Sequence, residues 1–471
     1  MKDIMFKTKS WQDGLSLVLG LWLAVKVGQP RMFRAVGVVA AYLAVAAVLL
    51  SGSRTGLAGA VAAVALWLLL SRAHLSALVL SLAVAAPAAA VAVWAFTRPA
   101  LVEDGGSRAD RVADGAWFGL LLIVGAAVAL LVSARLRGFG SGRRFPAVLS
   151  ALVLAATIGG VVLAIAVGGS GASAEQGPRR FFDPSANNRL AWWGEAIDVF
   201  AADPLLGSGA GTFEVARKRY RENAVSTIQP HSVPLQFLAG TGLVGLALFA
   251  ALAAAAVTAA AGALRRLEGA ERDAAAALSV ALALWLTHAL VDYDWDFVAV
   301  TGPVLFAAGV LASAGRRPRE SARPLRAAAA VALALAAAVS VVTPWLAERS
   351  VREVGAALDR GDLAAAADSA ARARSLDPLS LAPLFARARV EETKNDAEAA
   401  LATYREAVRL QPENPETWYQ LGLYEFHRGD RCSAYVHLNE AYTLDPAGTQ
   451  WIPGGPLEQA LAWVNVAGNC G

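Results

Sequence analysis

The sequence has few charged residues and few cysteines, and each scarcity excludes a class of protein. Only 17% of its 471 residues are charged, whereas soluble domains have about 25%. Its 2 cysteines cannot build a disulfide framework, and no CxxC pair is present to predict a zinc site. The net charge of +4 is spread over short loops, so we expect no nucleic acid as a partner.

Long apolar runs take the place of the missing charges. A helix that crosses a bilayer needs about 20 apolar residues. The candidate stretches are a weak first one at 15–27, followed by 33–50, 55–71, 74–96, 114–133, 145–167, 233–263, 274–291, 297–314 and 327–346. We therefore expect an all-α, polytopic transmembrane helix bundle of about ten spans over residues 11–346. The polar N-terminus runs straight into the first stretch, which is not the pattern of a cleavable signal peptide.

Lysine and arginine are concentrated in alternate loops. The basic loops begin at Lys26, Arg72, Arg135, Arg265 and Arg316. Short loops of this kind stay in the cytoplasm, whereas long loops are translocated largely regardless of charge. The remaining loops are then external, and they are 51–55, 97–113, 168–232 and 292–296, with everything after Trp345.

Similar phrases recur in the C-terminal part with a period of 34 residues: SLDP at 375–378, RLQP at 409–412 and TLDP at 443–446. This period is typical of tetratricopeptide repeats. The signature positions of the last unit are occupied by Trp418, Leu421, Gly422, Ala434, Ala441 and Pro446. We expect a small tetratricopeptide-repeat α-solenoid over 347–450 and a tail over 451–471. Its concave face would bind a protein or peptide partner; the alternative is a passive domain that stabilises or spaces.

The two cysteines both fall in this C-terminal part. Cys432 lies in the turn between the helices of the last repeat, and Cys470 is the penultimate residue. An external compartment permits disulfides. We therefore predict a disulfide between Cys432 and Cys470.

Several polar groups lie at the predicted external boundary. Arg54 in SGSRTG marks the outer end of a span, as a snorkelling arginine also would. Asp292, Asp294 and Asp296 either hold a divalent cation or form a solvated helix end, and we expect no metal there. A lone His231 is more often a boundary residue than a catalytic one.

The large external loop has its own pattern. Apolar residues that include Trp192 and Trp193 predict an amphipathic helix lying against the membrane, which Asp203-Pro204 ends. The glycines at 207, 209 and 211 superficially resemble a phosphate-binding loop. No strand precedes them and no Gly-Lys-Ser/Thr follows, so we interpret the segment as a turn.

Taken together, these motifs resemble a known family. His231-Ser232 is followed after nine residues by Gly242-Leu-Val-Gly245, SGSRTGLAGA stands at 51–60, and a stretch runs from Arg189 to DPLLGSGAGTF. The sequence is similar in these features to bacterial O-antigen ligases and the related O-antigen polymerases and O-oligosaccharyltransferases. The similarity covers roughly residues 50–310. The stretch between Arg54 and Arg189 is longer than is usual in the family.

The resemblance implies a function. Family members transfer a glycan from a polyprenyl-pyrophosphate carrier to an acceptor hydroxyl, outside the bacterial cytoplasmic (inner) membrane and without ATP or another cofactor. Arg54 and Arg189 would bind the pyrophosphate, because a guanidinium is planar, permanently charged and able to bind phosphate oxygens bidentately. His231 would take the proton from the acceptor hydroxyl, since an imidazole ordinarily titrates near neutral pH.

Other residues and alternatives stay open. Possible substrate-binding residues are Arg217, Arg221, Trp192, Trp193 and Asp292. The acceptor is a glycan, a lipid or a protein, because ligases, polymerases and protein O-oligosaccharyltransferases share these motifs. A lipid-linked glycan transporter is a second class, although it would place charges along a pathway in the membrane. A membrane-tethered scaffold that works only through its repeats is a third.

Overall fold

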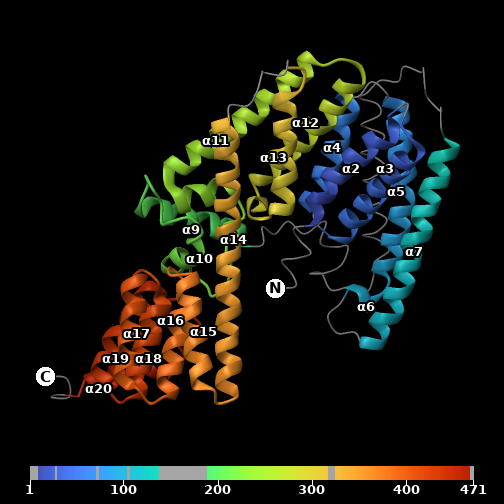
Figure 1. Cartoon of the computed structure of the whole chain (residues 1–471). Coiled ribbons are helices and arrows are strands. Elements are labelled where there is room, and N and C mark those ends of the chain that lie inside the picture. Colours follow the sequence, from blue (N-terminus) through green and yellow to red (C-terminus); the bar gives the residue numbers. More distant parts are fainter. Residues whose placement is uncertain are drawn as a thin grey trace. The chain divides into compact units, whose positions relative to one another are not determined.

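The computed structural model describes residues 9–26, 29–52, 54–70, 74–102, 107–136, 188–316 and 324–466. The side chains of 9–15, 54–55, 74–75 and 324–326 are not among the described parts. Every regular element in these ranges is a helix (Figure 1), which confirms the all-α prediction. The chain divides into two compact units. The first comprises Met1–Trp193, Pro230–Leu238 and Leu243–Arg316, and the second Gly194–Gln229, Ala239–Gly242 and Arg317–Gly471.

The first unit contains the apolar helices. They are α2 (Lys9–Val25), α3 (Arg31–Leu50), α4 (Arg54–Leu70), α5 (His74–Phe96), α6 (Pro99–Val102), α7 (Arg108–Arg135), α12 (Gly269–Ala289), η3 (Asp294–Asp296) and α13 (Val298–Ser313). Two further helices, α9 (Arg189–Ala202) and α11 (Val233–Arg266), have residues in both units. The helix α9 ends at Ala202, directly before the predicted stop at Asp203-Pro204.

Helix length and composition identify the membrane spans. Five helices of the described residues are long and apolar enough to cross a membrane: Arg31–Leu50, Ser76–Phe96, Arg108–Arg135, Val233–Arg266 and Ala327–Asp359. Shorter apolar helices cover Ser16–Val25, Gly56–Leu70 and Val298–Ser313. The protein is therefore a multi-pass membrane protein. The count of ten spans stays a prediction, because 145–167 lies outside the described residues and α12 is not among these helices.

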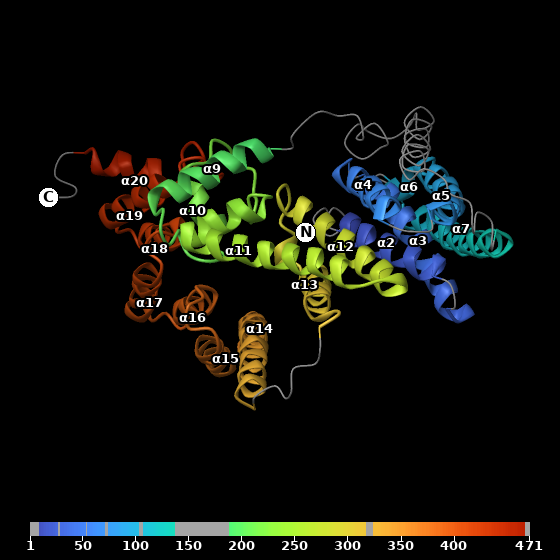
Figure 2. The same ribbon diagram turned by 90° about the horizontal axis from the view of Figure 1, so that it is seen from above.

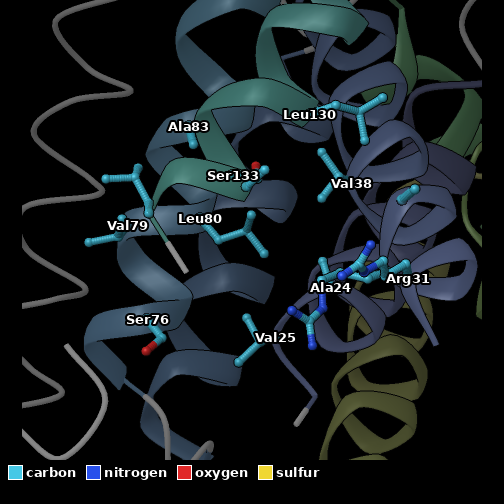
Figure 3. A pocket seen from close by; sticks show the side chains of 14 residues that line it. Ala24, Val25, Arg31, Val38, Ser76, Val79, Leu80, Ala83, Leu130 and Ser133 are labelled. Atoms are coloured by element: carbon cyan, nitrogen blue, oxygen red, sulfur yellow. The ribbon is translucent and has the colours of Figure 1, made fainter. Parts of the chain in front are cut away.

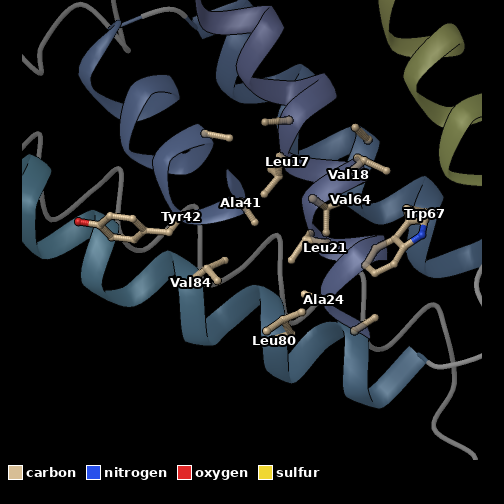
Figure 4. Packing of buried hydrophobic residues seen from close by; sticks show 14 of the residues in the cluster. Leu17, Val18, Leu21, Ala24, Ala41, Tyr42, Val64, Trp67, Leu80 and Val84 are labelled. Carbon is tan, nitrogen blue, oxygen red and sulfur yellow. The ribbon is translucent and has the colours of Figure 1, made fainter. Parts of the chain in front are cut away.

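The helices α2, α3, α4, α5 and α7 pack into one bundle (Figure 1). A Cβ at Gly20 would lie 2.7 Å from the Gly37 carbonyl oxygen, and one at Gly37 would lie 2.6 Å from the Gly20 oxygen. These glycines let α2 and α3 approach closely, as small residues do in membranes. Trp67 and Tyr42 belong to the buried core of this bundle (Figure 4). At one end of the bundle, the ends of α2, α3, α5 and α7 surround a cavity (Figure 3).

The second unit contains the helical repeats. Its helices are α10 (Phe213–Ala216), η2 (Arg217–Arg219), α14 (Pro324–Asp359), α15 (Leu363–Leu376), α16 (Ala382–Thr393), α17 (Ala397–Leu410), α18 (Pro415–His427), α19 (Arg431–Leu444) and α20 (Pro456–Val464). Helices α14 to α20 follow one another in chain order (Figure 2). Neighbouring pairs pack antiparallel, which is the arrangement that the repeat spacing predicts.

The joint between paired helices is the same in each repeat. Asp362, Asp396 and Asp430 cap α15, α17 and α19, each accepting a hydrogen bond from the backbone N–H three residues later. The residue before each cap has a positive φ: 73° at Gly361, 57° at Asn395 and 86° at Gly429. Glycine and asparagine adopt this conformation at little cost. The 34-residue period thus repeats a turn and a cap as well as a pattern of apolar residues.

Gly242 breaks the helix α11. Its φ of 62° is not helical, and a Cβ there would lie 2.3 Å from the carbonyl oxygen of Leu205. The break leaves carbonyl groups without helical partners, and the backbone N–H groups of Ser208 and Gly209 donate to those of Ala239 and Gly240 at 3.0 and 2.9 Å. The glycine-rich segment that we interpreted as a turn is therefore fixed against α11, and Gly242 makes that contact possible.

Candidate functional site

His231 lies just before α11 and has an unusual backbone. Its φ is 54°, a left-handed conformation that is uncommon for residues other than glycine. Such conformations are found disproportionately at functional sites, because the surrounding structure must hold them in place. Here Trp193 contributes to that hold, since its Nε1 donates a hydrogen bond to the His231 carbonyl oxygen at 3.4 Å.

The carboxylate of Asp292 is the centre of the site. Its Oδ1 lies 3.0 Å from His231 Nδ1, and its Oδ2 accepts a hydrogen bond from Arg189 Nη2 at 3.2 Å. Arg189 starts α9, and Asp292 follows α12. Arg189 is 103 positions and His231 is 61 positions from Asp292 in the sequence, yet both contact its carboxylate. A proton on His231 Nδ1 satisfies this bond, which leaves the lone pair of Nε2 for another partner.

A second histidine–carboxylate pair lies behind the first. His288 Nε2 lies 3.3 Å from Asp292 Oδ2, and His288 Nδ1 contacts Asp294 Oδ2. Both His288 and Asp294 are 1% exposed. The four side chains form a continuous chain from His231 through Asp292 and His288 to Asp294. Because a buried carboxylate is costly unless it is paired, this chain holds Asp292 in one position.

Aromatic rings enclose His231. The Trp192 ring stacks on the imidazole with centroids 4.9 Å apart and planes at 17°. The Tyr293 ring meets it edge-on at 4.5 Å. Trp192 and Trp193, predicted to lie at the membrane surface, are thus both in contact with His231. Together these rings restrict the imidazole to an orientation in which one nitrogen faces Asp292.

The charges in this site follow from burial and neighbours. Burial by itself would raise the pKa of the Asp292 carboxyl, but hydrogen bonds with His231 and His288, with the charge of Arg189, hold that pKa below its usual range. Burial, followed by the negative charge of nearby carboxylates, raises the pKa of Tyr293 to about 12. At neutral pH the carboxylate is ionised and the phenol protonated. An ionised Asp292 stabilises the imidazolium that forms when His231 accepts a proton.

An apolar groove reaches the same residues from the helix bundle. It has a volume of about 330 Å³ and lies between α4 and α12. Small and aliphatic residues line most of it, including Ala62 and Leu284, and His288 lies at one end. A lipid tail in this groove would therefore end beside the residue that contacts Asp292.

Arg217 and Arg221, both candidates for substrate binding, lie in the second unit and have carboxylate partners there. Arg217 donates to both oxygens of Glu195, at 2.6 and 3.1 Å, and the two residues are 1% and 6% exposed. Arg221 donates to both oxygens of Asp445 at 2.8 and 2.7 Å. These bonds give both arginines a structural role: Arg217 joins the η2 segment to α9, and Arg221 joins the chain after η2 to the last repeat.

Two predicted sites fall outside the described parts. Arg54 begins α4, but its side chain is not described. Cys470 lies beyond the last described residue, so its pairing with Cys432 stays a prediction. The three aspartates considered as a cation site have separate partners in the structure. Asp292 and Asp294 contact histidines, and Asp296 accepts a hydrogen bond from Gln236 at 2.7 Å.

Residues 112–250 match the family described as O-antigen ligase. The chain carries an O-antigen ligase domain. That family implies an enzyme that transfers glycans, and Arg189 and His231 both lie within the matched residues. Residues 393–425 match a TPR repeat, which confirms the repeat prediction. No curated protein matches the chain.

The sequence did not point to His288 or Glu195. His288 lies in an apolar stretch that predicts a plain span, although an ionisable residue at membrane depth is itself a functional signal. Nothing in the sequence near Glu195 indicates that Arg217 is its partner. Asp292 was recognised only as one of three aspartates, and it lies beyond the residues that match the family.

Proposed function

We propose that this protein is a membrane glycan ligase that transfers an oligo- or polysaccharide from a polyprenyl-pyrophosphate carrier to an acceptor hydroxyl on the external face of the cytoplasmic membrane. The observation that carries the proposal is the Asp292 carboxylate, which pairs with His231 on one oxygen and with Arg189 on the other. In such an arrangement His231 would act as a base beside Arg189, whose cation would bind phosphate. Both residues lie in the O-antigen ligase domain.

The reaction needs one bond to form and one to break. The acceptor oxygen bonds to the anomeric carbon of the donor sugar as the bond from that carbon to the pyrophosphate breaks. His231 Nε2 takes the proton of the acceptor hydroxyl, and ionised Asp292 stabilises the resulting imidazolium. General-base catalysis of this kind contributes typically 10²–10⁴-fold. Pyrophosphate departs readily without being protonated. The site therefore needs cations that stabilise its negative charge more than it needs a general acid.

Arg189 is suited to the pyrophosphate. It uses one Nη2 hydrogen bond on Asp292, and a guanidinium carries five N–H donors. The donors that remain can bind phosphate oxygens. Arg54 is proposed to assist from the start of α4, and the groove between α4 and α12 offers an apolar channel for the lipid tail. Trp192 would cover the sugar next to His231.

The test is loss of transfer without loss of protein. His231→Ala and Arg189→Ala should each abolish glycan transfer in a host strain that depends on this gene, while the protein accumulates in the membrane at the wild-type level. Asp198→Ala is a matched control, because it changes an exposed residue of α9 outside the cluster. Transfer that persists in both test variants would refute the assignment.

The orientation is a separate part of the proposal, because it depends on charge in the loops. An alkaline phosphatase fusion after Leu358 should be active if the repeats lie outside the cytoplasm. A stable but inactive fusion means that they lie inside. A strain that carries the inactive His231→Ala variant distinguishes a ligase from a transporter. Loss of a transporter would leave lipid-linked glycan on the inner face of the membrane, whereas loss of a ligase would leave it on the outer face.

The acceptor class distinguishes a ligase from its relatives. A polymerase would lengthen the lipid-linked glycan itself, and a protein O-oligosaccharyltransferase would modify a protein. Analysis of where the glycan accumulates in wild-type cells identifies which applies. The repeats are proposed to recruit the acceptor or a partner, so deletion of 347–471 should alter acceptor choice; complete loss of function in a stably inserted deletion would favour the scaffold.

A further inference from the structure

The cavity among the ends of α2, α3, α5 and α7 combines apolar walls with two arginines. It has a volume of about 380 Å³. Aliphatic residues make up most of the lining, among them Val38 and Leu80 (Figure 3). Arg31 and Arg34 line it from the start of α3. Among the described residues, the lining contains no aspartate or glutamate. A ligand that fits it has an apolar part and at least one negative charge.

Two polar atoms in this lining are buried without a partner. Arg34 Nε and Ser133 Oγ are both inaccessible and have no hydrogen bond within the described part of the chain. They come from different helices, α3 and α7. An unpaired buried donor costs free energy, and native structures rarely leave one without a partner or ligand. Both side chains line the cavity, so an acceptor bound there would lie next to these two unpaired polar groups.

The charge pattern at the start of α3 also favours an anion. Arg31 and Arg34 lie in the first turn of a 20-residue helix whose first turn contains no acidic residue. The positive end of a helix dipole disfavours cations at this position and favours anions. The N-cap, Pro30, supplies no side-chain hydrogen bond. The guanidinium groups of Arg31 and Arg34 therefore lie at the start of α3, and no described residue of the lining carries a carboxylate that would neutralise them.

We propose that this cavity binds an anionic phospholipid, with its phosphate on Arg31, Arg34 and Ser133 and its acyl chain along the apolar walls. The helix ends around the cavity are those that loop charge predicts for the cytoplasmic face, where a headgroup of the inner leaflet lies. Free phosphate fits less well, because it would leave the apolar lining empty. The site is separate from the His231 cluster and does not depend on its proposed chemistry.

The experiment compares headgroups on the full-length protein purified in detergent. Phosphatidylglycerol and phosphatidylcholine of the same acyl composition are added separately, and the lipid retained is measured by native mass spectrometry. Wild-type protein should retain phosphatidylglycerol preferentially. Replacing Arg31 and Arg34 together by glutamine should weaken that retention by roughly tenfold or more, because hydrogen bonds to charged groups are lost.

The control removes the same charge elsewhere. Arg265→Gln with Arg316→Gln changes two exposed arginines of other predicted basic segments that do not line the cavity, and it should leave retention unchanged. Ser133→Leu fills the cavity without changing charge and should reduce retention as the double arginine variant does. Retention by Ser133→Leu also tests the proposal if the double arginine variant fails to accumulate.

Three results would overturn the proposal. The first is equal retention of the two lipids by the wild-type protein. The second is an equal loss in the control variant, which would mean that phosphatidylglycerol is attracted by surface charge in general. The third is displacement of phosphatidylglycerol by inorganic phosphate alone, which would identify a free anion as the ligand.

Discussion

Two regions of this protein pair arginine with carboxylate, and they do so differently. In the second unit, Arg217 binds both oxygens of Glu195 and Arg221 binds both oxygens of Asp445. In the first unit, Asp292 is shared by Arg189, His231 and His288. In a bidentate pair, two N–H groups of the arginine bond both carboxylate oxygens. Where one carboxylate is shared, Arg189 keeps N–H donors and His231 keeps one nitrogen that another molecule can bind.

The comparison separates two-residue ion pairs from a carboxylate that several side chains share. Arg189 and Arg217 both lie within residues 112–250, which match the O-antigen ligase family. They differ in their partners and in their exposure, which is 26% for the Arg189 side chain and 2% for that of Arg217. Bidentate pairing adds energy and fixes geometry, while a carboxylate that contacts several groups orients them and tunes their protonation.

The largest effect should come from Asp292→Asn. The change keeps the side-chain shape but removes the charge, and its amide can present N–H to His231 Nδ1 and so favour the wrong tautomer. Glycan transfer should fall by roughly 10²–10⁴-fold, the usual contribution of a general base. Transfer is measured in membranes that contain equal amounts of protein. Asp296→Asn is the control, and wild-type transfer by the Asp292 variant would contradict the shared-carboxylate interpretation.

A large loss of stability should follow Arg217→Ala. Glu195 would remain buried without its partner, which typically costs about 3–5 kcal/mol. Thermal unfolding of the purified protein measures the change. The matched variant pairs Arg217→Met with Glu195→Leu; it removes both charges and should be more stable than the single variant. An unchanged melting temperature for Arg217→Ala would mean that the pair is not buried in solution.

The smallest effect should come from Arg219→Ala. Arg219 bonds Glu413 at 2.6 Å, but the two side chains are 45% and 78% exposed. Exposed pairs contribute about 0–1 kcal/mol, so the melting temperature should scarcely move. A loss as large as that of Arg217→Ala would mean that exposure does not distinguish these pairs.

Several elements were predictable because the signal is local. The end of α9 follows from Asp203-Pro204, and the repeat joints follow from a fixed spacing of 34 residues. Arg189 and His231 were found through short motifs. In each case the residues that determine the structure lie within a few turns of the chain.

The partners of the charged residues were not predictable in this way. Arg221 and Asp445 are 224 positions apart, and nothing near Arg221 distinguishes it from an arginine that binds substrate. His288 looked like part of an apolar span because its partners lie in the following loop. Whether a charged residue is structural or takes part in chemistry depends on the partners that it meets, and only the folded chain brings those partners close.

The uniform joints of the repeats have a further consequence. Each joint consists of a left-handed residue and an aspartate cap, 34 positions after the previous one. Recombination that duplicates or removes a whole multiple of that length restores a complete joint at the splice, whereas other lengths leave a helix without its cap. The length of this domain can therefore change in discrete steps while each joint keeps its cap.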